Sequence, residues 1–147
     1  MAYWLFKSEP NTWSWSDQIA VGSKGTEWDG VRNYQARNNM DKMKINDLGF
    51  FYHSVKERNI VGIVRVIAEA HNDTTTNDST WRCVDLAYHK SFANPVNLDT
   101  IKLTPSLSDM VLVKNSRLSV QPVTEREWNI SCLSLIHISE PTRPTPI

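Results

Sequence analysis

Short runs of apolar residues recur along this chain, and their composition predicts a series of β-strands. Residues 2–7 (AYWLFK) form an aromatic run that stops shortly before a proline, which favours a first strand. Residues 59–70 (NIVGIVRVIAEA) are apolar and β-branched almost throughout, which predicts a strand buried on both faces. The alternation over residues 81–88 is typical of a half-buried strand, and two further strands are predicted within residues 46–54 and 116–123.

Two helices are predicted between the first strand and the later ones. Ser14 and Asp17 have the spacing of a capping box, which predicts a helix of one or two turns with Trp15 and Ile19 facing inward. A second helix is predicted over residues 33–43, after a loop that contains three glycines.

The order of these elements indicates the fold class. A strand and two helices are followed by strands that read as a meander and then by a terminal helix, which predicts a single α+β domain. In the second helix, Arg37 and Asp41 have the spacing of an i,i+4 ion pair. The sequence contains neither GxGxxG nor a P-loop motif, which argues against those two kinds of nucleotide site.

The composition is that of an ordinary globular protein, with 147 residues, 40% of them hydrophobic and 22% charged. Sixteen basic residues balance sixteen acidic ones, so the net charge does not identify a polyanionic partner and does not exclude a local basic patch. Six tryptophans are many for this length and raise the expectation of a stacking site. Cys83 lies in an apolar run, which predicts a buried free thiol.

The two ends of the chain bear on localisation and on the domain boundary. The start, MAYWLFKSEP, does not resemble a signal peptide, and no apolar run approaches the roughly 20 residues of a membrane span. We therefore expect a cytoplasmic monomer with no membrane contact. The last residues resemble a translated sequencing adapter and contain Pro141, Pro144 and Pro146, which prevent a helix or a central strand. The domain is therefore predicted to span residues 1–131, with residues 132–147 as a non-native or disordered tail.

Residues 32–39 (RNYQARNN) are unusual for a helix. They offer two arginines, three asparagines, a glutamine and a tyrosine, which present hydrogen-bonding atoms or a flat face. A helix selected for stability alone would favour Ala, Leu, Glu and Lys, because asparagine competes with the helical backbone. We therefore predict that this segment holds a planar partner.

A nucleobase is a planar partner that such residues would suit, because stacking contributes ~1–3 kcal/mol per base and amides or guanidinium groups read the base edge. The predicted pocket combines the rings of Trp28, Tyr34 and Tyr52 with the polar groups of Ser8, Asn33, Gln35, Arg37 and Gln121. A phosphate-binding surface is predicted at Arg32, Arg37, Lys42 and Lys44, although an ordinary solvated helix face would also explain the lysines.

Other polar residues have simpler interpretations. Residues 7–9 (KSE) form either a solvated strand end or a set of groups aimed at a ligand. His53, His71 and His89 do not have the spacing of a known catalytic or metal-binding motif. We therefore expect no enzyme activity, no catalytic residues, no metal site and no cofactor.

Five segments resemble the EVE domain, a PUA-like domain related to YTH and ASCH domains: YWLFKSEP, WDGVRNYQARNNM, FYHS, VGIVRV and RLSVQPVTEREW. The resemblance covers about residues 2–131 and implies a mixed β-barrel with short flanking helices. It also implies a reader of modified bases, including 5-methyl- and 5-hydroxymethylcytosine in DNA, which flips the base at a cost of a few kcal/mol. The base pocket that it implies consists of Lys7, Ser8, Glu9, Pro10, Trp28, Asn33, Tyr34, Gln35, Arg37, Tyr52, His53, Ser119 and Gln121.

The functional hypothesis from the sequence is a non-enzymatic domain that binds nucleic acid and recognises a modified base, a cytosine derivative in DNA. Three alternatives stay open at this point. They are a reader of a modified base in RNA, an enzyme that acts on a nucleobase, and an interaction module whose pocket holds a peptide or a small anion.

Overall fold

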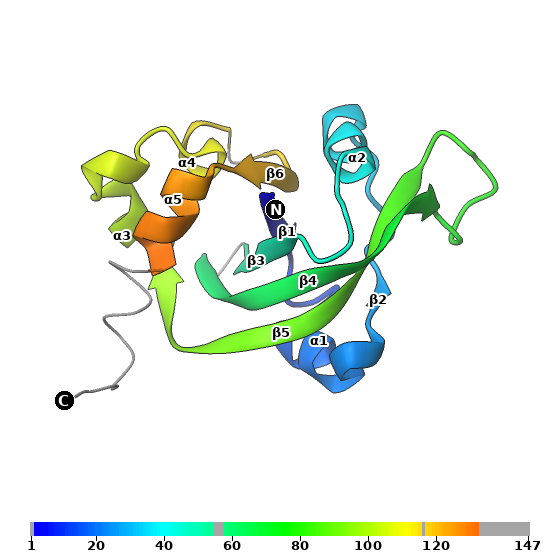
Figure 1. Cartoon of the computed structure of the whole chain (residues 1–147), viewed down its shortest axis with the longest axis horizontal. Coiled ribbons are helices and arrows are strands. Elements are labelled where there is room, and N and C mark those ends of the chain that lie inside the picture. Colours follow the sequence, from blue (N-terminus) through cyan, green and yellow to red (C-terminus); the bar gives the residue numbers. More distant parts are fainter. Residues whose placement is uncertain (1, 55–57, 116, 133–147) are drawn as a thin grey trace.

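The computed structural model describes residues 2–54, 58–115 and 117–132 (Figure 1). Six strands form one mixed sheet in the order β2-β5-β4-β3-β1-β6. β1 and β3 are parallel, and the other ladders of the described residues are antiparallel. The strands are β1 (Tyr3–Ser8), β2 (Thr26–Glu27), β3 (Leu48–His53), β4 (Asn59–Asn72), β5 (Arg82–Asn97) and β6 (Val120–Val123). This confirms the α+β class and the β3–β4–β5 meander.

The helices are short and lie around this sheet. Figure 1 shows α1 beside the long β4–β5 hairpin, α2 on the other side of that hairpin, and α3, α4 and α5 gathered near β6. A membrane crossing would need a longer and more apolar helix than any that the described residues form. The helices are α1 (Trp15–Val21), η1 (Gly22–Lys24), α2 (Tyr34–Asp41), α3 (Leu98–Lys102), η2 (Pro105–Leu107), α4 (Val111–Lys114) and α5 (Glu125–Ile130).

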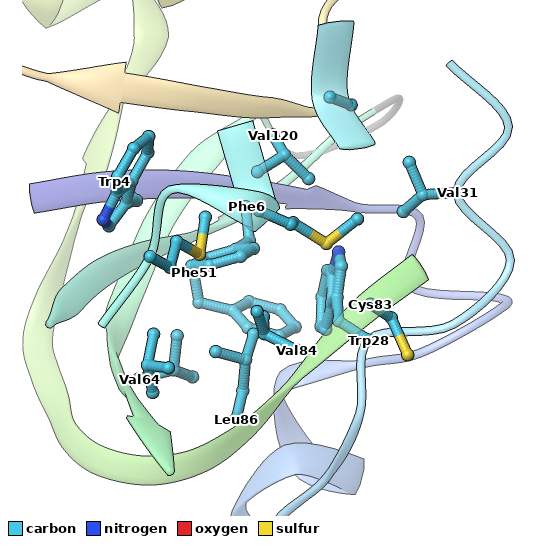
Figure 2. Packing of buried hydrophobic residues seen from close by; sticks show 14 of the residues in the cluster. Trp4, Phe6, Trp28, Val31, Phe51, Val64, Cys83, Val84, Leu86 and Val120 are labelled. Atoms are coloured by element: carbon cyan, nitrogen blue, oxygen red, sulfur yellow. The ribbon is translucent and has the colours of Figure 1, made fainter. Parts of the chain in front are cut away.

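Two apolar cores lie on opposite faces of the sheet. Because neighbouring residues of a strand point to opposite faces, Trp4 and Phe6 of β1 enter the first core and Leu5 enters the second. β3 divides in the same way, with Phe51 in the first core and Phe50 in the second. Figure 2 shows the first core, with Phe6 and Phe51 among its rings. Burial on both faces holds the end of β1 rigidly.

β5 is longer than the sequence pattern predicts. It runs for 16 residues, from Arg82 to Asn97, instead of ending at Tyr88. Its pairing with β4 shifts register at several points, and β5 carries the extra residues at two of them, between Tyr88 and Lys90 and between Ser91 and Val96. A search for strict alternation therefore loses the strand where the first irregularities occur.

The capping box at the start of α1 is confirmed, but the inward face of this helix differs from the prediction. The Ser14 hydroxyl accepts a hydrogen bond from the Asp17 amide, and the Asp17 carboxylate accepts one from the Ser14 amide. Trp15 is buried as predicted, whereas Ile19 is 44% exposed. Gln18 occupies the buried position, because its side-chain amide donates a hydrogen bond to the Leu86 carbonyl.

α2 begins where the sequence predicts, but its expected internal ion pair does not form. The Asn33 side chain accepts a hydrogen bond from the Ala36 amide and caps the helix. Asp41 pairs with Arg82 of β5 at 2.8 Å instead of with Arg37. Arg37 instead donates a hydrogen bond to the Thr80 carbonyl at 3.1 Å, so both side chains bind the neighbouring hairpin.

Three other expectations concern the closure of the sheet, the thiol and the tail. Among the described residues no ladder joins β2 to β6, so closure into a complete barrel is not seen there. Cys83 is fully buried and free, as predicted, and burial raises the pKa of its thiol. Cys132 packs against the second core, and residues 133–147 lie outside the described residues.

Candidate functional site

A cavity of about 380 Å³ opens at the end of β1. It lies where β1 leaves the sheet and meets the segment that leads from β2 to α2. The Lys7 amide donates a hydrogen bond to the Ser119 carbonyl at 2.8 Å, which joins the end of β1 to the chain just before β6. The lining residues are Lys7, Ser8, Glu9, Thr12, Trp13, Thr26, Glu27, Trp28, Asp29, Gly30, Val31, Arg32 and Ser119.

Two tryptophans, Trp13 and Trp28, line the cavity. The Trp28 ring is held in the first core by edge contacts with Phe6 and Phe51, at centroid distances of 5.5 and 5.7 Å. The Trp13 indole donates a hydrogen bond to the Gln18 side-chain oxygen at 2.9 Å. These contacts with neighbouring side chains hold both rings in place.

The polar atoms of the cavity carry both signs of charge. Lys7 and Arg32 are cationic, and Glu9, Glu27 and Asp29 are acidic. Burial lowers the pKa of Lys7, while the nearby Glu9 carboxylate raises it. Mixed charges of this kind suit a polar ligand with both donors and acceptors on its rim.

The carboxylates of Glu27 and Asp29 differ in their partners. Burial opposes ionisation of Glu27, but hydrogen bonds from the hydroxyl and amide of Thr74, together with the Cys83 thiol and His71, lower the Glu27 pKa. Burial raises the pKa of Asp29, and the neighbouring carboxylates of Asp73 and Glu27 raise it further. No hydrogen bond between described residues uses the Asp29 carboxylate, which can therefore accept one from a ligand.

Asp73, in the loop between β4 and β5, fixes the wall that contains Gly30 and Arg32. Its carboxylate accepts hydrogen bonds from the Gly30 amide at 2.9 Å, the Arg32 guanidinium at 3.1 Å and the Thr75 amide at 2.8 Å. Burial alone would raise the pKa of Asp73, but hydrogen bonds from Thr75, Gly30 and Arg32 lower it to about 2. Gly30 has a φ of 77°, a backbone conformation that favours glycine.

The structure brings together only part of the predicted site. Six predicted residues line the cavity, including Arg32, which was assigned to phosphate: Lys7, Ser8, Glu9, Trp28, Arg32 and Ser119. Tyr34, Gln35 and Arg37 do not line it, so the prediction that they share one pocket with Trp28 is corrected. The physical reason is that α2 buries its Ala36 face in the first core, which leaves these side chains outside the cavity.

The remaining predicted residues serve the fold or lie at other places. Tyr52 points into the second core and borders a second cavity, which shares Lys7 and Glu9 with the first. The ring nitrogen of His53 accepts a hydrogen bond from the Trp15 amide at 3.0 Å. Four further predicted residues also lie outside the lining: Asn33 caps α2, Pro10 lies in the turn after β1, and Lys42 and Lys44 border another hollow near Ala2.

Gln121 is almost completely buried, and its side-chain amide donates a hydrogen bond to the Leu118 carbonyl at 2.7 Å. It therefore holds the turn before β6 and does not line the cavity. Trp13, Glu27 and Asp29 were missed as site residues. Trp13 directly precedes the capping box at Ser14, and Glu27 and Asp29 flank Trp28 in the predicted loop, so no motif marks these three residues as site residues in the sequence.

Comparison with known proteins finds the same domain elsewhere. The EVE domain model matches residues 2–132. Thymocyte nuclear protein 1 of Mus musculus is 34% identical over an alignment of 159 positions, gaps included, that covers 86% of this chain and 70% of that protein. A crystal structure of an Agrobacterium tumefaciens protein is 49% identical, with a TM-score of 0.88 and coverage of 98% of this chain and 99% of that one.

A further solved structure carries DNA. It is the human THYN1 protein in complex with 5-methylcytosine-containing DNA, 31% identical to this chain with a TM-score of 0.84. The similarity covers 98% of this chain and 100% of that one.

Proposed function

Because this chain belongs to the EVE domain family, we propose that it binds DNA that contains a modified base and takes that base, a 5-modified cytosine, into the cavity at the end of β1. A relative with the same fold has been solved with 5-methylcytosine-containing DNA, which supports this partner. We further propose that the protein binds the base without altering it chemically.

The observation that carries the proposal is the cavity itself, with two fixed indoles and an acceptor carboxylate that is available to a ligand. Its volume of about 380 Å³ lies in the range of small-ligand pockets. Extrusion of a base costs a few kcal/mol, least where the base is already weakly stacked. Stacking on an aromatic ring returns ~1–3 kcal/mol, so contact with one or both indoles offsets most of this cost.

Asp29 gives the cavity a means of preferring cytosine. Cytosine carries an exocyclic amino group that donates to a carboxylate, whereas thymine presents a carbonyl oxygen at the same place. A correct pairing of this kind is worth ~1–3 kcal/mol against the wrong base. The largely buried Val31 offers apolar contact to a 5-methyl group, worth ~0.8 kcal/mol or about fourfold in affinity.

The test is a titration of labelled duplexes that differ at one position, which holds 5-methylcytosine, cytosine or thymine. The wild-type protein should bind the 5-methylcytosine duplex most tightly and the thymine duplex at least tenfold more weakly. Asp29→Asn should reduce that preference to less than threefold. The control is Asp109→Asn, which removes an exposed carboxylate on the side of the second core and should leave the preference unchanged.

Three outcomes would contradict the proposal. Equal affinity for all three duplexes would remove base recognition, and tighter binding of a matched RNA would replace DNA as the partner. Recovery of the oligonucleotide with a changed mass would make the protein an enzyme and not a reader.

A further inference from the structure

Two neighbouring aromatic rings, with an arginine on each outer face, adjoin the cavity on the outer side of α2. The Arg32 guanidinium carbon lies 5.5 Å from the centre of the Trp81 ring. The Trp81 and Tyr34 rings are 5.1 Å apart and inclined by 32°, and the Arg37 guanidinium carbon lies 5.1 Å from the Tyr34 ring. We call Arg32, Trp81, Tyr34 and Arg37 the arginine–aromatic stack.

Both ends of the stack are held by hydrogen bonds. At one end, Arg32 donates to the buried Asp73 carboxylate at 3.1 Å. At the other end, Arg37 donates to the Thr80 carbonyl at 3.1 Å and to the Asn38 side chain at 2.8 Å. The stack is therefore ordered before any ligand arrives, which lowers the entropy lost on binding.

A role in packing alone does not account for this arrangement. Tyr34 is 61% exposed, and the buried residues of α2 are Ala36, Asn39 and Met40 on its other face. The Arg37 guanidinium has a neutral side chain, Asn38, as its hydrogen-bond partner, so its positive charge is not neutralised there. The molecule therefore holds an exposed ring and a positive charge in place on its surface.

The stack begins at the rim of the cavity. Arg32 lines the cavity and also belongs to the stack, whereas Trp81, Tyr34 and Arg37 do not line the cavity. A DNA strand whose base enters the cavity must pass its flanking phosphates over the rim. Guanidinium groups bind phosphates well, and an exposed aromatic ring packs against sugars or unstacked bases.

We propose that the arginine–aromatic stack binds the DNA backbone next to the extruded base, independently of the base identity. This inference rests on the proposed function for its partner, but it assigns Tyr34 and Arg37 to affinity and not to base recognition. The cavity then determines which base is preferred, and the stack contributes affinity that decreases as the salt concentration rises.

The test compares Arg37→Ala with Arg126→Ala, which removes an exposed arginine from α5 on the side of the second core. Affinity for the 5-methylcytosine, cytosine and thymine duplexes is measured over a series of salt concentrations. Arg37→Ala should weaken all three on the order of tenfold at low salt and reduce the salt slope by about 1. Arg126→Ala should change neither quantity, and Arg37→Lys should restore the slope but only part of the affinity.

The two proposals fail in different ways. If Arg37→Ala behaves like Arg126→Ala, or if it alters the preference among bases and leaves the slope unchanged, the stack is not a backbone site. If the wild-type protein shows no preference among bases while Arg37→Ala still lowers affinity and slope, base recognition fails and the stack proposal stands. Absence of any DNA binding by the wild-type protein overturns both.

Discussion

Replacement of Asp73 by asparagine should loosen the wall of the cavity that contains Gly30 and Arg32. The Asp73 side chain is only 1% exposed and accepts hydrogen bonds from both residues and from Thr75. Its pKa is about 2, compared with an ordinary value of 3.8. This difference of nearly two pKa units corresponds to about 2 kcal/mol of stability that depends on the ionised form.

The pH dependence has a definite sign. Because the pKa of Asp73 is lower in the folded protein, its contribution is fully present well above 3.8 and is lost as the pH falls toward 2. Asp73→Asn should therefore lower the free energy of unfolding by about 2 kcal/mol near neutral pH. The difference between the two proteins should fall to about half of that near pH 3.

Urea denaturation, followed by tryptophan fluorescence at several pH values, measures both quantities. Asp78→Asn is a matched control in the same loop, because Asp78 is exposed and accepts a hydrogen bond from the Thr80 amide. The control should change stability much less than Asp73→Asn. A loss of stability for Asp73→Asn that does not vary with pH, or that equals the loss in the control, would refute the reasoning.

Three further predictions concern the fold and the pH dependence of binding. Ser14→Ala should lower the free energy of unfolding by about 1 kcal/mol through loss of the helix cap, while Ser16→Ala in the same helix should not, as thermal or urea denaturation will show. Gly62→Ala should cost ~1–3 kcal/mol or more in the same assay, because a methyl group there would collide with the Trp15 indole. Burial and neighbouring carboxylates raise the pKa of Asp29. In a duplex titration at decreasing pH, the preference of the wild-type protein for cytosine over thymine should decline as this carboxylate becomes protonated, whereas Asp29→Asn should show no such decline.

Local sequence rules predict several parts of this fold well. The capping box at Ser14 and the cap at Asn33 involve residues three positions apart, so the chain itself brings the partners together. The two-residue period of β3 likewise places Phe50 and Phe51 on opposite faces of the sheet, and the structure buries each of them in a different core. Such features depend on spacing along the chain and not on the tertiary fold.

The composition of the site depends more on contacts between distant segments. Asp73 accepts hydrogen bonds from Gly30 and Arg32, which lie 43 and 41 positions away in the sequence. No local sequence pattern predicts contacts over such separations. Trp81 joins the stack for the same reason, because the β4–β5 hairpin carries it to α2.

The position of Tyr34 and Arg37 outside the cavity follows from the geometry of α2. In a helix, Ala36 and Met40 lie on one face of α2, and Tyr34 and Arg37 lie on another. Because the first face packs into the first core, the second face is left outside that core.

A crystal structure of the protein with a duplex that carries one 5-methylcytosine tests the central claim most directly. We predict that the methylated ring leaves the duplex and occupies the cavity lined by Trp13 and Trp28, with its amino group within hydrogen-bonding distance of Asp29. A methylated base that stays stacked in the duplex, with the DNA bound away from this cavity, would contradict the account.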